Sequence, residues 1–192
     1  MLQETLKQAT SADHDRLEQL MHVGDIMSGK LSLAQYKQIL TTNYLVHRNF
    51  EHSLFNTLSP EIKQQLDLTH REKLAALQKD MDELNIPEPE NDAEEITFDK
   101  NDAELLGAMY VLEGATLGGS VIVKRLKTNP NFEGLNLNYY QIYGEQLIPM
   151  WKKFCEVLNK QPESSSDDAV NGAKKMFNYI AAVQQQNSLV QK

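Results

Sequence analysis

The most constraining feature of the sequence is the segment GAMYVLEGATLGG, residues 107–119, which reads as helix and yet contains four glycines. Each glycine inside a helix costs about 1 kcal/mol relative to alanine. At about 100° per residue, Gly107, Gly114 and Gly118 fall within an arc of roughly 40°. Gly119 lies to one side of them. A buried helix without side chains along one line lets either another helix or a flat ligand approach its backbone, and both candidates stay open.

Length and composition predict a single helical domain. The chain has 192 residues, 41% of them hydrophobic, which is enough for one sizeable core. Long runs rich in Leu, Ala, Gln, Glu and Lys favour helix, and nine glycines and six prolines are too few for an all-β protein with many tight turns. The predicted fold is therefore all-α, with one compact multi-helical domain over residues 1–192.

Charge and cysteine content exclude several classes of function. A net charge of −8 argues against nucleic acid as a partner, because phosphate binding needs a basic surface. Cys155 is the one cysteine, which excludes an intrachain disulfide and a metal cluster held by cysteines. No segment approaches 18 uninterrupted apolar residues, and the first ten residues contain no apolar signal core. We therefore expect a soluble, cytoplasmic protein with no membrane partner, and nothing demands more than a monomer.

Periodicity and cap residues predict about six helices. The first covers about 2–22 and ends in the VGDIMSGK segment, and a capping box of Ser32 and Gln35 opens the second, which continues to residue 58. The remaining predicted helices start at Pro60 after Ser59, after a Thr69–Glu72 capping box, and at about residues 102, 139 and 169. The helix over 102–127 contains the glycine run, and the helix over 139–158 is expected to kink at Pro149.

Three polar residues of the first helix share one face with its apolar stripe. His14 lies on the stripe, and Glu18 follows one turn later, where a carboxylate could orient a metal-ligating imidazole. Lys7 lies two turns before His14, about 10 Å away along a straight helix. Taken alone, each is more often an ordinary core, boundary or surface residue. Opposite the glycine run, they describe a slot with a histidine on one wall and a cation at its rim.

Three motifs in the same order resemble bacterial heme oxygenases. The segment LKQATSADHDRLE (6–18) resembles the proximal helix of that family, and YVLEGATLGG (110–119) resembles its distal helix. YGEQLIPMWKKF (143–154) resembles a third bacterial motif. The resemblance implies a compact all-α fold with heme between the first helix and a kinked glycine-rich helix. It also implies oxidative opening of heme to biliverdin with release of iron and CO, using O2 and electrons from a partner reductase or ferredoxin.

The resemblance also assigns roles to individual residues. His14 would be the proximal iron ligand, with Glu18 orienting it. The backbone of Gly114 and Gly118 would line the distal side, where O2 reacts. The complete set of implied heme-binding residues is His14, Glu18, Lys7, Tyr110, Gly114, Gly118 and Gly119, with Lys7 and Tyr110 at the propionates. This arrangement agrees with heme chemistry, in which the polarity and access of the distal pocket decide the fate of O2.

The sequence departs from the family pattern at a few positions. Ala115 follows Gly114, where animal members carry an acidic residue and many bacterial members a serine, so distal water would be held by backbone groups. Leu147 and Ile148 replace a threonine–glycine pair, which adds bulk in a helix expected near the heme edge. Ser11 stands where animal members have a second basic residue on the first helix.

Two further functions remain open on the sequence. One is a heme carrier, store or sensor of the same fold without turnover. The other is a heme-free member that acts on another small molecule, such as a thiamin-related compound. His47, Glu51 and His52 could suggest a di-iron site, but no second E-x-x-H partner is found and a solvated or boundary role is expected.

Other polar residues are expected to have structural roles. The three tyrosines in the third motif region are expected to pack, and the basic residues of two helices to be solvated, with docking of an acidic electron donor as a hypothesis. These residues are Tyr139, Tyr140 and Tyr143, and Lys124, Arg125, Lys127, Lys152 and Lys153.

Overall fold

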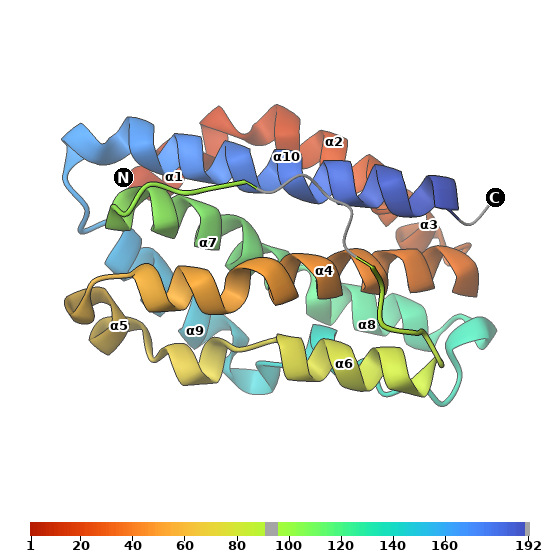
Figure 1. The fold of residues 1–192 in the computed structure, drawn as a ribbon. Coiled ribbons are helices and arrows are strands. Elements are labelled where there is room, and N and C mark those ends of the chain that lie inside the picture. The colour runs from red at the N-terminus through yellow and green to blue at the C-terminus, as the bar shows by residue number, and fades with distance from the viewer. Residues whose placement is uncertain (91–95, 191–192) are drawn as a thin grey trace.

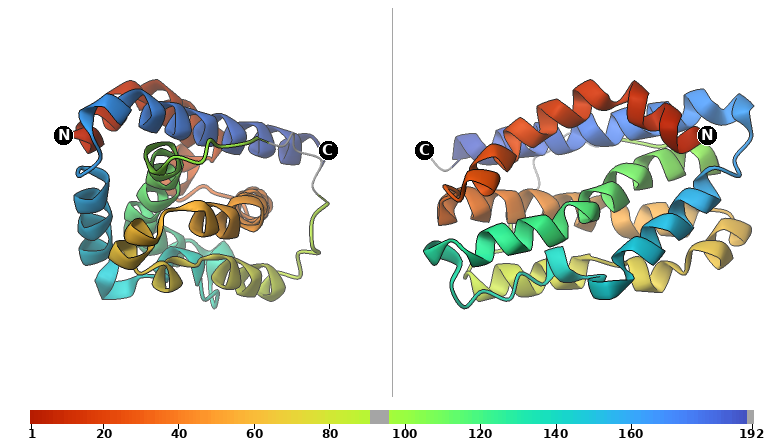
Figure 2. Two further views of the ribbon diagram at one scale, coloured as in Figure 1. Left: turned by 60° about the vertical axis from the view of Figure 1, so that its left-hand side comes forward. Right: turned by 180° about the vertical axis from the view of Figure 1, so that it is seen from behind.

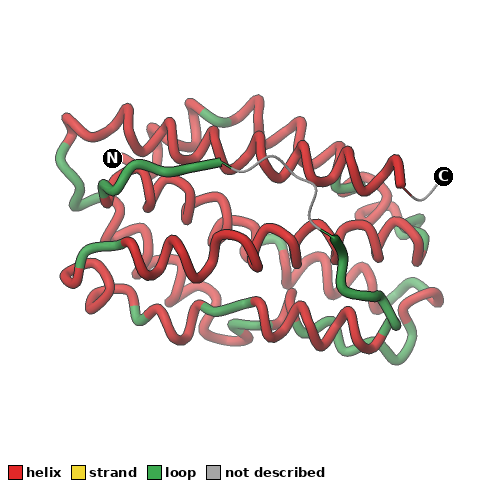
Figure 3. The backbone as a smooth tube through the Cα atoms, viewed as in Figure 1, coloured by secondary structure: helices red, strands yellow, loops and turns green. Residues whose placement is uncertain are grey.

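The computed structural model describes residues 1–90 and 96–190, and in this part of the chain it contains helices and no strand (Figure 1, Figure 3). The all-α prediction is therefore confirmed. The α-helices are α1 (Leu2–Ala9), α2 (Ser11–Leu20), α3 (Val23–Ser28), α4 (Leu33–Thr57), α5 (Pro60–Leu66), α6 (Leu74–Glu83), α7 (Asp102–Leu117), α8 (Gly119–Lys127), α9 (Leu147–Leu158) and α10 (Ser166–Val190). Short 3-10 turns are η1 (Leu68–Arg71), η2 (Pro130–Phe132), η3 (Tyr139–Gln141), η4 (Gly144–Gln146) and η5 (Glu163–Ser165).

Helix α7 is the centre of the fold. It packs against α10, α9 and α4, and α8 follows it after Gly118 (Figure 2). Helices α1 and α2 lie along α10, and α3 reaches α8 at the far end of the molecule. The two segments of the predicted slot are thus held by shared neighbours, since α10 packs against both α7 and α2.

The central helix region, α7 with α8, is long and strongly apolar. The stretch Asp102–Lys127 could cross a membrane by length and composition alone. However, 56% of its most apolar window is buried inside the protein, as expected for the core helix of a bundle.

Two glycines are explained by the crossing of α7 and α10. A Cβ on Gly107 would overlap the backbone carbonyl of Ala169 in α10, and a Cβ on Gly172 would overlap the backbone carbonyl of Glu104 in α7. The two helices therefore approach each other reciprocally through residues without side chains. For Gly107, the close neighbour that the sequence could not specify is another helix.

Two predicted helices are interrupted in the structure. The helix of the glycine run breaks at Gly118, which confirms the expected kink, with α7 ending at Leu117 and α8 beginning at Gly119. The first helix, predicted as continuous over 2–22, breaks at Thr10. The hydroxyl of Thr10 donates a hydrogen bond to the carbonyl of Leu6 (2.8 Å), a back-bond that often bends helices.

The cap predictions have mixed outcomes. The Ser32–Gln35 capping box is present, and Ser59 caps α5 at Ile62. The Thr69–Glu72 capping box is wrong, because residues 68–71 form the 3-10 turn η1 and α6 begins later, at Leu74. A carboxylate from another helix caps α6 instead, as described below.

Two further boundaries differ from the prediction. The helix expected over 139–158 consists of η3, η4 and α9, and Pro149 lies in the first turn of α9 rather than at a kink. Its missing N–H is harmless there, since the first four amides of a helix have no intrahelical partner. Residues 23–28, expected only to end the first helix, form the short helix α3, which stops at Gly29 with φ +70°.

Candidate active site

His14 lies on α2 and is more exposed than its sequence pattern suggested. Its side chain is 58% exposed, and α2 contains no fully buried residue. The expectation of a buried face is therefore wrong, because α2 packs against α10 on one side only. The ring of Phe177 from α10 contacts the imidazole edge-to-face at 6.3 Å between centroids. Helix α10 thus supports the ring while the other side of the imidazole stays accessible.

Both ring nitrogens of His14 have a carboxylate nearby. Nε2 lies 3.8 Å from Glu18 Oε1, and Nδ1 lies 3.8 Å from Asp15 Oδ1. Within the described chain neither nitrogen makes a hydrogen bond, because both distances are too long. One nitrogen is thus free to act as a metal ligand, while the other has an acceptor that can orient it. Asp15 is a neighbour of the His14 imidazole that the sequence analysis missed.

The two predicted propionate-binding residues come from different helices. Lys7 is exposed in the last turn of α1, and the bend at Thr10 separates it from His14, so the straight-helix estimate of their spacing no longer applies. Tyr110 is half-buried on α7, where its ring packs on Trp151 at 5.7 Å. Burial, followed by the proximity of Cys155, raises the pKa of Tyr110, which keeps its hydroxyl a hydrogen-bond donor.

The glycines of the run face three different environments. A Cβ on Gly119 would lie 2.7 Å from the carbonyl oxygen of Tyr140, so protein packing explains this glycine. A Cβ on Gly114 would meet the ring of Trp151 at 3.8 Å, an ordinary contact. Gly118 is exposed and has φ −68° and ψ −19°, which any residue adopts. Its nearest neighbour would be Ile122 Cδ1 at 3.7 Å. Nothing in the described protein requires glycine at position 118.

A cavity of about 220 Å³ lies beside α8 but not at the predicted slot. It is lined by Thr116 and Ser120 together with Tyr140 and other residues of the η3–α9 region. Thr116 and Ser120 are each two positions from Gly118 in the sequence. Each is therefore about 200° away from Gly118 around the helix. The cavity therefore lies behind the glycine run and does not include His14.

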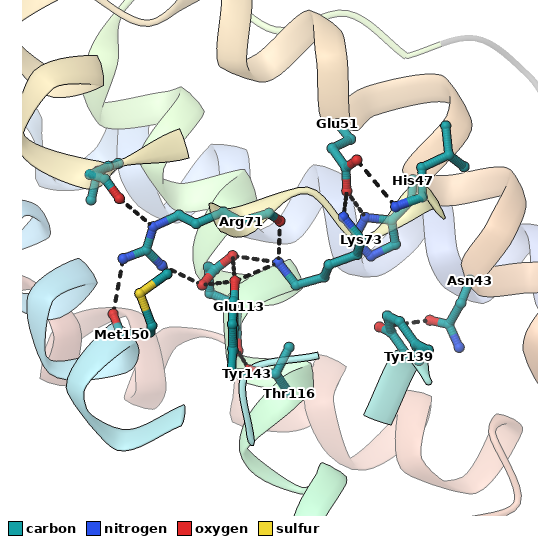
Figure 4. Close-up of polar contacts among 12 residues, drawn as sticks. Asn43, His47, Glu51, Arg71, Lys73, Glu113, Thr116, Tyr139, Tyr143 and Met150 are labelled. Atoms are coloured by element: carbon teal, nitrogen blue, oxygen red, sulfur yellow. Dashed lines mark hydrogen bonds and ion pairs between the residues drawn. The ribbon is translucent and has the colours of Figure 1, made fainter. Parts of the chain in front are cut away.

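A buried polar cluster, here called the Glu113 cluster, comprises Glu113, Arg71, Lys73 and Tyr143 (Figure 4). Arg71 donates to Glu113 Oε2 at 2.5 Å, and Lys73 donates to Oε1 at 2.6 Å. The Tyr143 hydroxyl lies 2.9 Å from both carboxylate oxygens. Burial opposes ionisation of Glu113, but the two cations outweigh it and lower the pKa of this carboxyl. The cluster thus holds the Glu113 carboxylate between two basic side chains inside the protein.

His47 and Glu51 lie next to this cluster and are also buried. The imidazole Nδ1 and the carboxylate are 2.8 Å apart, and their exposed fractions are 2% and 6%. The expected solvated or boundary role is therefore wrong for both. Burial lowers the pKa of His47, although Glu51 opposes this shift. The carboxylate of Glu51 accepts from the amides of Lys73 and Leu74, so it caps the N-terminus of α6.

Sequence reasoning missed the Glu113 cluster although one signal was present. Glu113 is the one charged residue between positions 105 and 123, inside an apolar helix, and an isolated charge there needs buried partners. The partners themselves lie 40 and 42 positions away, so the sequence does not identify them. The expectation that Tyr143 only packs is also incomplete, because its hydroxyl joins the cluster.

The chain is similar to known proteins over most of its length. The sequence profile of the heme oxygenase family matches residues 1–186. A heme oxygenase of Xanthomonas campestris is 28% identical over 151 residues, covering 78% of this chain and 88% of that protein. Heme oxygenase PigA of Pseudomonas aeruginosa is 27% identical over 182 residues, covering 91% and 87%.

The fold has a solved counterpart as well. The NO- and CO-bound heme oxygenase of Neisseria meningitidis superposes with a TM-score of 0.76 at 21% identity, over 97% of this chain and 92% of that one. At this identity the likeness concerns the fold. Together with the family match over nearly the whole length, it shows that the chain belongs to the heme oxygenase family.

Proposed function

We propose that this protein is a heme oxygenase that opens the heme ring to biliverdin, releasing iron and CO, with His14 as the iron ligand. The observation that carries the proposal is Gly118, which is exposed, has ordinary helical angles and has no protein neighbour that excludes a side chain. Glycine costs a helix about 1 kcal/mol relative to alanine, and no close contact within the described protein requires it at position 118. We therefore infer that the missing side chain leaves space for a ligand. His14 would supply the donor that heme iron needs on its other face.

The residues of the slot fit heme. The heme supplies the reactivity toward O2, and the protein supplies position and hydrogen bonds. His14 would hold the iron through one ring nitrogen while Glu18 or Asp15 accepts from the other. Lys7 would pair with a propionate by charge, and Tyr110 would donate to one through its protonated hydroxyl. Gly114 and Gly118 would let the helix backbone lie against the distal face.

Adding hemin and then ascorbate in air tests the function. We expect a Soret band on addition of hemin, followed by its decay into the broad absorption of biliverdin. A stable Soret band would instead identify a heme carrier or sensor. Absence of a Soret band would favour a heme-free member of the fold and would contradict the proposal.

The electron donor is proposed to be an acidic reductase or ferredoxin that docks on basic residues of α8 and α9. Lys124 and Arg125 are exposed on α8, and Lys152 and Lys153 on α9, in a chain with a net charge of −8. Local positive charge raises the rate of encounter with an acidic partner, and salt screens this effect.

Reversing two of these charges should slow electron delivery. We expect Lys124→Glu with Arg125→Glu to lower the donor-driven rate about tenfold at low salt, because steering is lost. The rate with ascorbate should stay unchanged. The matched control reverses the exposed Lys30 and Lys79, which lie before α4 and on α6. Equal rates for both double variants at low salt would contradict the docking surface.

A further inference from the structure

We propose that Glu113 is a positioning residue, which through Arg71 and Lys73 fixes the backbone of the glycine run against the ligand slot. The inference rests on the proposed function, because the exposed side of the run is the proposed heme face. The residues of the Glu113 cluster are buried and lie on the side of α7 away from solvent, so they are not proposed to contact the ligand.

The Glu113 cluster joins α7 to several separate parts of the chain. Arg71 ends η1, Lys73 precedes α6 and Tyr143 precedes η4. Arg71 also donates to the carbonyl oxygen of Leu66 (2.8 Å) and to that of Met150 in α9 (3.0 Å). Lys73 donates further to the carbonyl of Arg71 and lies 2.9 Å from the Tyr143 hydroxyl. A shift of the Glu113 carboxylate would therefore disturb its contacts to Arg71, Lys73 and Tyr143 at once (Figure 4).

The part of the glycine run after Glu113, residues 114–118, needs such an anchor because most of it is not buried. Gly114 follows Glu113 directly and contacts only the far end of the Trp151 ring at the position of a Cβ. Gly118 is exposed, and the α-helix is interrupted there. Segments with few buried side chains open locally at low free energy. The carboxylate of Glu113 thus lies immediately before residues 114–118, where Thr116 is the one buried residue.

The formal charges of this region balance. Variants can therefore separate an effect on the position of the glycine run from an effect on the stability of the whole protein. The side chains of Arg71 and Lys73 both donate to Glu113, and a second carboxylate, Glu51, lies beside them and accepts from the backbone amide of Lys73. Replacing Glu113 alone by glutamine leaves an excess buried cation, which destabilises strongly. Replacing Lys73 by methionine in the Glu113→Gln protein restores the balance of formal charge. The double variant still lacks the carboxylate of Glu113 that ties α7 to Arg71.

Hydrogen exchange of the heme-free protein tests the proposal. In Glu113→Gln we expect amides of residues 114–121 to exchange at least ten times faster, beyond any change in α4 and α10. The double variant Lys73→Met with Glu113→Gln should recover stability and keep the fast exchange in the run. The matched control is Glu104→Gln, a carboxylate also buried on α7 and paired with Lys175. It should affect exchange near its own end of the helix.

The outcomes are distinguishable. Unchanged exchange in the run, or a uniform rise across α4, α7 and α10 in both variants, would leave the cluster a merely structural role and overturn the proposal. If Glu113→Gln does not fold, Tyr143→Phe removes one hydrogen bond without changing charge and should raise exchange in the run at least threefold. Because heme is absent from this experiment, a failure here with an intact Soret band would leave the proposed function standing. In the hemin complex, Glu113→Gln should also shift the Soret maximum, and Glu104→Gln should not.

Discussion

Gly107→Ala is expected to lower the free energy of unfolding by about 3 kcal/mol, at the upper end of the usual effect of overpacking a core. The added methyl group would overlap the backbone carbonyl of Ala169, and a carbonyl in a helix cannot turn away as a flexible side chain can. Helices α7 and α10 would have to separate. In a chain of this size, thermal unfolding should shift downward by about 6–12 °C, as measured by circular dichroism.

The reciprocal and control variants make this prediction specific. Gly172→Ala should behave like Gly107→Ala, because its methyl group would overlap the carbonyl of Glu104. Gly118→Ala should change stability by no more than about 0.5–1 kcal/mol, since alanine suits the helical angles there. It should instead weaken hemin binding, measured by Soret titration. Similar losses of stability at positions 107 and 118 would contradict the division of the glycines into packing and ligand positions.

His14→Ala is expected to reduce conversion of hemin by at least about a hundredfold, because loss of a group that merely orients a metal ligand already costs about 10- to 100-fold. The Soret band of the hemin complex should weaken or shift, since the imidazole would be the axial ligand. Stability should change little, because the side chain is 58% exposed. Visible spectra and single-turnover assays measure both effects.

A second histidine provides the control for this prediction. His70 is also exposed and lies 2.9 Å from a carboxylate, that of Asp67, one turn away in sequence. His70→Ala should leave the Soret band and turnover unchanged. Glu18→Gln should lower turnover about tenfold, as expected for a group that orients the imidazole. Unchanged spectra and turnover in His14→Ala would show that the iron ligand lies elsewhere.

Most of the fold could be predicted from local sequence pattern. The helical periodicity gave the all-α class, and the caps at Ser32 and Ser59 gave two helix starts that the structure confirms. The errors occur where distant residues decide the local structure. The start of α6 is set by Glu51, more than twenty positions earlier in the chain, and not by the neighbouring Thr69.

The candidate site could be predicted only in part, because some of its features also depend on residues that are distant in the sequence. The glycine run and the His14–Glu18 spacing lie within short segments, so the sequence and its family resemblance identify them directly. The exposure of His14 depends on how α2 packs against α10, which local pattern does not report.

By itself the sequence determined that one face of a helix in this protein lacks side chains along a line of glycines, because the spacing of residues around a helix is fixed. Only the tertiary structure decided what approaches each one. Helix α10 meets Gly107, the Tyr140 backbone meets Gly119, and Gly118 is left open. The physical reason is that a missing side chain is a local property, whereas the atoms that fill its space come from segments brought together by the fold. The same holds for Glu113, whose isolated charge is visible in the sequence but whose partners are supplied by packing.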